Sequence, residues 1–225
     1  MGAQPTPSAR RQAHKQELRR EILDAARRLF VRDGYDGFSL RKLAAEVGYS
    51  PAALYLHFKN KQEIFHCLVA ESFEMLMRTG PSPEHEAPDD PVAQLKLGMC
   101  RFVNFGLQHP DEYRLAFLVP NQGASTPEEA AASVGKNAAF TALRRRVELC
   151  METGRMQVAP VDLTAQAIWA ACHGITSLLI QRPQFPWFEP SQLIQRVIDS
   201  AVDSLLCAPS PARSKRSKGV SNGKR

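Results

Sequence analysis

The sequence predicts an all-α protein of about nine helices, in which a small three-helix module precedes a larger helical domain. Three observations support this fold class. Apolar residues recur at helical spacing, no run alternates with period two for long enough to form a strand, and prolines stand where first helical turns are expected. With 225 residues and 44% hydrophobic content, the chain can bury a core without disulfide or metal staples.

The first predicted helix runs from His14 to the two glycines that end it, Gly34 and Gly37. One face carries an apolar stripe at helical spacing, made of Leu18, Ile22, Ala25, Ala26, Leu29 and Phe30. The other side carries Arg19, Arg20, Arg27 and Arg28. This amphipathic pattern predicts that the arginines lie away from the core.

Two short helices follow. A helix over residues 40–47 lies between the cap Ser39 and the breaker Gly48. A helix over residues 51–58 is opened by Ser50, which is followed by a proline. Both boundaries rest on caps that act locally.

A fourth helix is expected from the cap Asn60, with a buried face of Ile64, Phe65, Leu68, Phe73 and Leu76. The prolines and acids of residues 80–91 predict a loop. Five further helices are expected over residues 91–109, 111–119, 127–154, 162–182 and 190–207.

Charge is divided unevenly along the chain. Residues 1–61 hold 12 Lys and Arg against 6 Asp and Glu, residues 62–207 hold 11 against 17, and residues 208–225 hold 6 basic residues and no acid. A basic head, an acidic body and a basic tail indicate that the ends meet a polyanion such as nucleic acid. Chance fluctuation with a solubilising tail is the alternative.

Several function classes find no support in the sequence. The five cysteines form no C-x-x-C pair, so buried free thiols are expected and no metal or other cofactor is predicted. No H-E-x-x-H, Walker or dinucleotide-binding motif occurs, which argues against an enzyme. The most apolar stretch, residues 167–180, is too short and too polar for a membrane span, and a secretory signal is lacking. A cytoplasmic protein with no membrane partner is therefore expected.

The most informative stretch is residues 39–58, SLRKLAAEVGYSPAALYLHF. Two helices of about eight residues, joined by a three-residue turn, have the proportions of a helix-turn-helix. The small side chains that open the second helix would let its backbone approach the floor of a DNA groove. Candidate phosphate contacts are the helix starts at Ser39 and Ser50 and the side chains of Tyr55, His57, Lys59 and Lys61. The pattern alone leaves open an ordinary helical hairpin with a solvated basic face.

Residues 18–68 closely resemble the DNA-binding domain of the TetR family of bacterial transcriptional regulators. In that family a helix precedes the helix-turn-helix, and the pattern Leu-Tyr-x-His-Phe-Lys-x-Lys, present here at residues 54–61, ends it. The matching residues are Ile22, Ala25, Ala26, Leu29, Phe30, Gly34, Tyr35, Leu43, Ala44, Val47, Gly48, Ser50, Leu54, Tyr55, His57, Phe58, Lys59, Lys61 and Phe65. The resemblance implies sequence-specific binding to double-stranded DNA.

The resemblance also implies roles for individual residues. Arg41 corresponds to a position that reads a base, and the base-facing start of the recognition helix corresponds to Pro51, Ala52 and Ala53. Family positions that hold the DNA backbone correspond to Tyr55, His57 and Lys61. Because proline and alanine make no bidentate contacts, further specificity is expected from Arg41, from DNA shape, or from a basic arm at Arg10 and Arg11.

The larger domain is less informative. Trp169, His173 and Gly174 resemble a Trp-x-x-x-His-Gly signature in the ligand domains of one TetR subgroup, and the first two share a helical face. Candidate residues of an effector pocket are Phe102, Phe105, Tyr113, Phe117, Trp169 and His173. Ordinary core packing is the alternative for each, with Gly174 permitting close helix packing.

The last two predicted helices carry an apolar stripe. By the resemblance, these helices form a four-helix homodimer interface. The candidate interface residues are Leu178, Leu179, Ile194, Ile198, Val202 and Leu205.

The predicted organisation has four segments: a disordered basic arm (1–13), a helix-turn-helix domain (14–61), a helical ligand-binding and dimerisation domain (62–207), and a disordered basic tail (208–225). The resulting hypothesis is a homodimeric repressor that a small, largely apolar ligand releases from a palindromic operator. The alternatives are a helical enzyme and a dimeric adaptor whose helix-turn-helix no longer binds DNA. Arg41, Tyr55 and Lys61 are intact, which argues against the adaptor.

Overall fold

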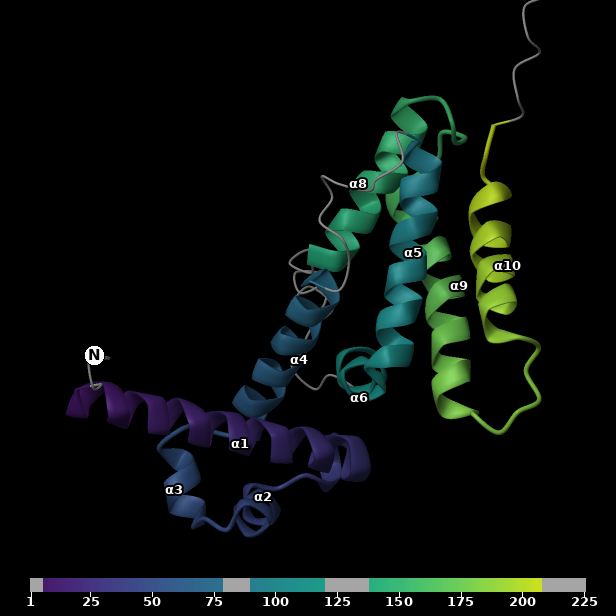
Figure 1. Cartoon of the computed structure of the whole chain (residues 1–225). Coiled ribbons are helices and arrows are strands. Elements are labelled where there is room, and N and C mark those ends of the chain that lie inside the picture. Colours follow the sequence, from purple (N-terminus) through teal and green to yellow (C-terminus); the bar gives the residue numbers. More distant parts are fainter. Residues whose placement is uncertain (1–5, 79–89, 120–137, 208–225) are drawn as a thin grey trace, which may run out of the picture.

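The computed structural model describes residues 6–78, 90–119 and 138–207, which form nine α-helices, one π-helical turn and no strand (Figure 1). This confirms the predicted all-α fold. Four predictions fall partly or wholly outside the described residues: the first five residues of the arm at 1–13, the tail at 208–225, most of the loop at 80–91, and the first part of the helix at 127–154.

Helix α1 (Pro7–Gly37) lies across α2 (Leu40–Val47) and α3 (Pro51–Tyr55), and the three helices form the head (Figure 1). Helix α1 begins at Pro7 instead of His14, because Thr6 Oγ accepts a hydrogen bond from the backbone N–H of Ala9 at 3.3 Å and proline suits a first turn. The arm predicted as disordered is therefore helical from Pro7 onward.

Helix α4 (Lys61–Arg78) rises from the head into the body, which comprises the elements that follow it (Figure 1). Asn60 Oδ1 accepts a hydrogen bond from the backbone N–H of Glu63 at 2.9 Å, as expected for a cap. Early residues of α4, such as Ile64 and Leu68, lie in the head core, whereas Leu76 packs against the body core. Helix α4 therefore links the two cores through one continuous helix.

The body consists of α5 (Pro91–Gln108), α6 (Pro110–Tyr113), the π-helical turn η1 (Arg114–Leu118), α8 (Ala138–Glu152), α9 (Val161–Gln181) and α10 (Pro190–Asp203). Helices α5, α9 and α10 run side by side (Figure 1). The single helix predicted over 111–119 is therefore two elements, of which the second is wound more loosely.

Helices α5 and α9 pack tightly against each other at Gly106. A Cβ on this residue would lie 2.4 Å from Thr176 Cγ2 and 2.8 Å from Tyr113 Cδ2, so a larger side chain does not fit. At Gly174, by contrast, a Cβ would meet nothing within 4 Å. The alternative that Gly174 serves close helix packing is therefore not supported within a single chain.

Helix α9 is the one helix of the described residues that is long and apolar enough to cross a membrane, judged by length and composition. It is also the helix that α5, α8 and α10 all pack against. Central packing in a helical body accounts for its composition.

Candidate functional site

Local capping builds the turn between α2 and α3. Ser39 Oγ accepts a hydrogen bond from the backbone N–H of Lys42 at 3.3 Å, and Ser50 Oγ accepts one from Ala53 at 3.2 Å. Gly48 ends α2 with a φ of 72°, a left-handed conformation that favours glycine. The two helix starts are thus fixed by the chain itself, before any partner binds.

The residues expected to read bases are at the surface of this motif. Arg41, Pro51 and Ala52 are exposed, and Ala53 is half-buried. Arg41 forms no hydrogen bond or ion pair with another described residue, so its guanidinium is available to a ligand. The small side chains at the start of α3 leave its backbone accessible to a groove.

The expected phosphate ligands differ in availability. Tyr55 is 58% exposed, and Lys59 is also exposed. The ammonium of Lys61 instead lies 4.3 Å from the ring centre of Tyr35 and donates a hydrogen bond to the Tyr35 carbonyl at 3.4 Å. Lys61 therefore holds α4 against the end of α1.

Arg19 of α1 is a positioning residue that the sequence reasoning missed. It donates hydrogen bonds to the His57 carbonyl at 3.1 Å and to Cys67 Sγ at 3.3 Å, and its guanidinium lies 4.2 Å from the ring centre of Phe58. These contacts hold the chain after α3 against α1. The expectation that Arg19 lies away from the core is wrong, since the side chain is half-buried.

The His57 ring turns partly inward. Its Nδ1 is buried and has no hydrogen-bond partner among the described residues. Burial lowers the pKa of His57, and the positive charges of Lys15 and Arg19 lower it further. The ring is therefore neutral at pH 7, and a phosphate contact from it would not be ionic.

The basic arm has a different form from the one expected. Arg10 is exposed and lies within α1, and Arg11 follows it in the same helix. The start of α1 is the end of the head farthest from the body (Figure 1). A minor-groove role for these two arginines stays a prediction.

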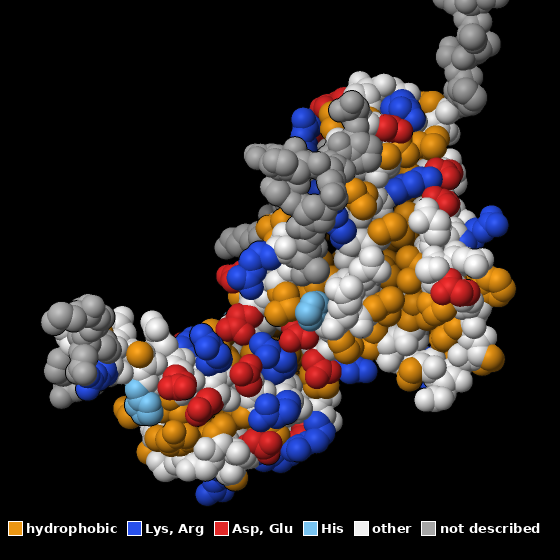
Figure 2. Space-filling view, in the orientation of Figure 1, with side chains coloured by type: hydrophobic (Ala, Val, Ile, Leu, Met, Phe, Trp, Pro, Cys, Tyr) orange, Lys and Arg blue, Asp and Glu red, His pale blue; other side chains and the backbone are white. Residues whose placement is uncertain are grey.

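A cluster of ion pairs joins the head to the body. Arg27 of α1 approaches Asp24 at 2.9 Å, Glu71 of α4 at 3.1 Å and Glu112 of α6 at 3.6 Å. Charged side chains of both signs gather where α1 meets the base of α4 (Figure 2). The expectation that Arg27 lies away from the core is also wrong, because this side chain is only 19% exposed.

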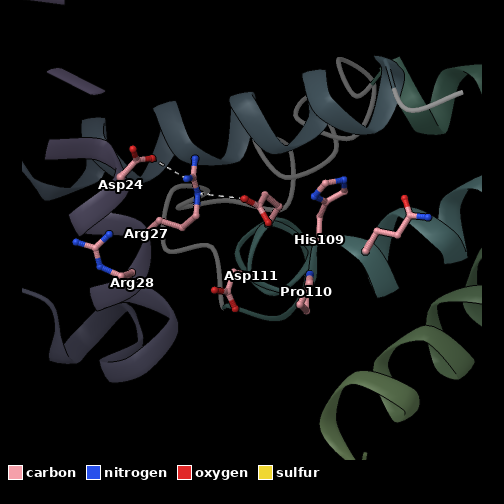
Figure 3. Close-up of a pocket in the computed structure, with 8 residues that line it drawn as sticks. Asp24, Arg27, Arg28, His109, Pro110 and Asp111 are labelled. Atoms are coloured by element: carbon pink, nitrogen blue, oxygen red, sulfur yellow. Dashed lines mark hydrogen bonds and ion pairs between the residues drawn. The ribbon is translucent and has the colours of Figure 1, made fainter. Parts of the chain in front are cut away.

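A hollow of about 350 Å³ lies beside Arg27, between α1 and α6 (Figure 3). Its lining residues are Asp24, Arg27, Arg28, Gln108, His109, Pro110, Asp111 and Glu112. Because most of these side chains are charged and Arg27 is paired with both Asp24 and Glu112, the hollow is a polar junction and not an apolar ligand pocket.

The body contains a polar pair in apolar surroundings. The Tyr113 hydroxyl lies 2.6 Å from His173 Nδ1, and Ser177 Oγ lies 3.3 Å from His173 Nε2. Burial raises the pKa of Tyr113 to about 12 and lowers the pKa of His173. Both rings are therefore neutral at pH 7, and the imidazole is held at both nitrogens.

Five of the six expected pocket residues come together around this pair. The Phe117 ring centre lies 4.9 Å from Tyr113, 6.0 Å from His173 and 6.4 Å from Trp169, and Phe102 lies 5.8 Å from Tyr113. We call Phe102, Tyr113, Phe117, Trp169 and His173 the aromatic cluster. Phe105 is fully buried and faces His109 instead. Binding of an effector by the aromatic cluster stays a prediction.

The expected dimer stripe is largely turned inward. Ile194, Ile198 and Val202 are buried in the core of their own chain, so they offer no surface to a second copy. Their assignment to a dimer interface is wrong, because the apolar face of α10 packs on α5 and α9. Leu179 and Leu205 are half-buried, and Leu178 is 48% exposed.

The cysteines are only partly as expected. Cys150 and Cys172 are buried, Cys67 and Cys100 are half-buried, and Cys207 is exposed, so burial was wrongly expected for the last. Within the described ranges no group of three or more His, Cys, Asp and Glu side chains is arranged to hold a metal ion.

Two family models match the chain. Residues 22–68 match the bacterial regulatory proteins of the tetR family, and residues 95–205 match a tetracyclin repressor-like C-terminal domain. Together these matches cover more than half of the chain.

Among curated relatives, the HTH-type transcriptional repressor AcnR of Corynebacterium diphtheriae is 43% identical over 53 residues, 24% of this chain and 28% of AcnR. The nucleoid occlusion factor SlmA of Escherichia coli O1:K1 is 35% identical over 108 residues, 48% of this chain and 54% of SlmA. The chain thus matches less than two thirds of either relative. A putative tetR family transcription regulator from Shewanella sp. PV-4 has the same fold, with a TM-score of 0.65 and 15% identity over 84% of this chain and 98% of the other.

Proposed function

Because this chain belongs to the TetR family of bacterial regulatory proteins, a family of transcription regulators and not of enzymes, we propose that it is a repressor that reads a palindromic operator. The observation that carries this proposal is the exposed guanidinium of Arg41, which pairs with no other described residue, beside the bare start of α3. Arginine is the residue best suited to bind a guanine edge in the major groove. Ser39 and Ser50 add helix starts at which phosphates are stabilised.

A homodimer follows from the size of the reading surface. One short recognition helix contacts too few base pairs to specify a genomic site, so two copies related by a two-fold axis are needed. Helix α9 supports this arrangement. It leaves Leu163 64% and Leu178 48% exposed, and between them Ala167 and the open Gly174 allow a second helix to approach closely.

Control by a small molecule is proposed for the aromatic cluster. Tyr113 of this cluster is separated by only one residue from Leu115, which is buried in the head core. A ligand that shifts α6 and η1 would therefore shift the head. In a dimer, this movement changes the distance between the two recognition helices and weakens operator binding.

The experiment is selection of binding sites from random DNA, followed by footprinting and sedimentation of the complex. The proposal predicts an inverted repeat and a particle of twice 25.0 kDa. Leu178→Glu should yield monomers that bind the repeat poorly, whereas Thr141→Glu, an exposed control on α8, should not. Failure to enrich any sequence, or enrichment of a single half-site by a monomer, would overturn the proposal.

A further inference from the structure

Two arginines of the body stand where their helices are otherwise apolar. Arg146 of α8 lies one turn from Leu143 and Cys150, and both of these residues are buried. Arg101 of α5 is followed by Phe102 and Val103, which are also buried. Both arginines are half-buried, although arginine rarely occupies such positions without a partner.

The two side chains are neighbours. A Cβ added to Gly98, one turn before Arg101 on α5, would lie 3.6 Å from Arg146 Nε and 3.7 Å from Arg146 Cζ. The guanidinium of Arg146 therefore lies against α5 at Gly98, one turn from Arg101. Burial lowers the pKa of Arg146, and the positive charge of Arg101 lowers it further.

Neither guanidinium has a counter-charge in the described part of the chain. Other arginines and lysines of the described residues form ion pairs with carboxylates. No described carboxylate lies within 4.0 Å of Arg101 or Arg146. Arg101 Nε is buried and has no hydrogen-bond acceptor among the residues that the structure describes. Two like charges that are partly removed from water without an acceptor destabilise the fold unless something else satisfies them.

We propose that Arg101 and Arg146 bind the anionic head group, a carboxylate or a phosphate, of the effector. A planar guanidinium presents parallel N–H donors that match two oxygens of such a group, and two arginines together neutralise it. Phe102 adjoins Arg101, and Phe140 on α8 lies 6.1 Å from Trp169, so an apolar body attached to the head group would contact the aromatic cluster. The inference rests on the proposed function in one respect, which is that the bound molecule is taken to be the effector.

The test uses three probes of equal chain length: octanoate, octyl phosphate and octan-1-ol. Thermal unfolding and the tryptophan fluorescence, to which Trp169 and Trp187 both contribute, are followed with the full-length protein in the absence of DNA. The variants are Arg101→Gln and Arg146→Gln. The matched control is Arg145→Gln, which removes an exposed arginine of the same helix that is already paired with Glu148 and Glu152.

Wild type and Arg145→Gln should bind at least one of the two anions roughly tenfold or more tightly than the alcohol, because a charge-assisted hydrogen bond contributes that much. Each of the other two variants should lose this preference while its binding of octanol is unchanged. The stronger anion identifies the head group. Equal binding of all three probes, binding of none, or an anion preference that survives in Arg101→Gln and Arg146→Gln would overturn the inference. Operator binding without ligand is measured separately, and its failure would count against the proposed function alone.

Discussion

The hydroxyl of Tyr113 and Nδ1 of His173 lie 2.6 Å apart and link α6 to α9. Gly106 of α5 packs against the same phenol ring, so three helices of the body meet at this hydrogen bond. Leu115, two residues after Tyr113, is buried in the head core. The pair therefore joins the centre of the body to the DNA-binding end of the molecule.

The pH dependence of stability should reveal the burial of His173. Folding lowers the pKa of His173 from its ordinary 6.5, so the unfolded chain binds this proton more readily than the folded chain. The contribution is favourable above pH 6.5 and is lost as the pH falls below that value. Urea unfolding at about pH 7.5 and about pH 5.5 should therefore show a smaller loss of stability in His173→Gln than in wild type.

His57, whose pKa is also lowered by burial, provides the comparison for this experiment. The variant His57→Gln should lessen the acid sensitivity independently, because His57 lies in the head and His173 on α9 in the body, so their effects should add. Identical pH dependence in wild type and His173→Gln would contradict the assignment.

Two glycines of α5 should respond in opposite ways to alanine. Gly106→Ala should destabilise the protein by roughly 1–3 kcal/mol, because its Cβ would overlap Thr176 and Tyr113. Gly98→Ala should stabilise it by about 0.5–1 kcal/mol, because its Cβ would make only ordinary contacts at 3.6 Å or more with Arg146 and alanine favours the helix. Thermal or urea unfolding measures both, and a change of the same sign in the two variants would refute the packing described.

Arg27→Gln should weaken the junction between head and body. The substitution removes the positive charge that lies between the carboxylates of Glu71 and Glu112 and is paired with both. We expect a loss of roughly 1 kcal/mol, limited by the partial exposure of Glu71, and a smaller loss at high salt. Arg32→Gln, which removes an exposed arginine of the same helix, is the control. If the two variants are equally stable, the Arg27 cluster does not hold the domains together.

Lys61→Ala should lower stability, because the lysine packs on the Tyr35 ring and binds its carbonyl. The expected loss is about 1 kcal/mol. Tyr55→Phe should instead leave unfolding unchanged and weaken binding about equally on operator and random DNA, since a phosphate contact carries no sequence information. Unfolding curves and DNA titrations of both variants separate the two roles, and an unchanged melting temperature for Lys61→Ala would contradict the structure.

The helix-turn-helix was predictable because its signals are local. The caps Ser39 and Ser50 and the glycine Gly48 each act within four residues, and the structure has them where the pattern predicts. The family match at residues 22–68 confirms the resemblance that these residues carry. Their contacts with DNA stay predictions.

The errors arose where a side chain's partner is distant in sequence. The amphipathic pattern predicts that Arg19 and Arg27 face solvent. Both are four residues from the buried Leu23 and so border the apolar stripe, and this spacing was the one signal in the sequence that indicated their partial burial. Helical periodicity does not encode which helices are neighbours. It therefore does not show that the apolar face of α10 packs within its own chain, nor that the close helix contact lies at Gly106 and not at Gly174.

The most direct test of the account is a fluorescence anisotropy titration of the selected operator and of its scrambled sequence, with wild type and Arg41→Ala at physiological salt. The account predicts that wild type prefers the operator by roughly 10³-fold or more. It predicts that Arg41→Ala loses roughly 1–3 kcal/mol of binding on the operator and little on the scrambled DNA. Equal affinity of the wild-type protein for both sequences would contradict the claim that this chain reads DNA sequence.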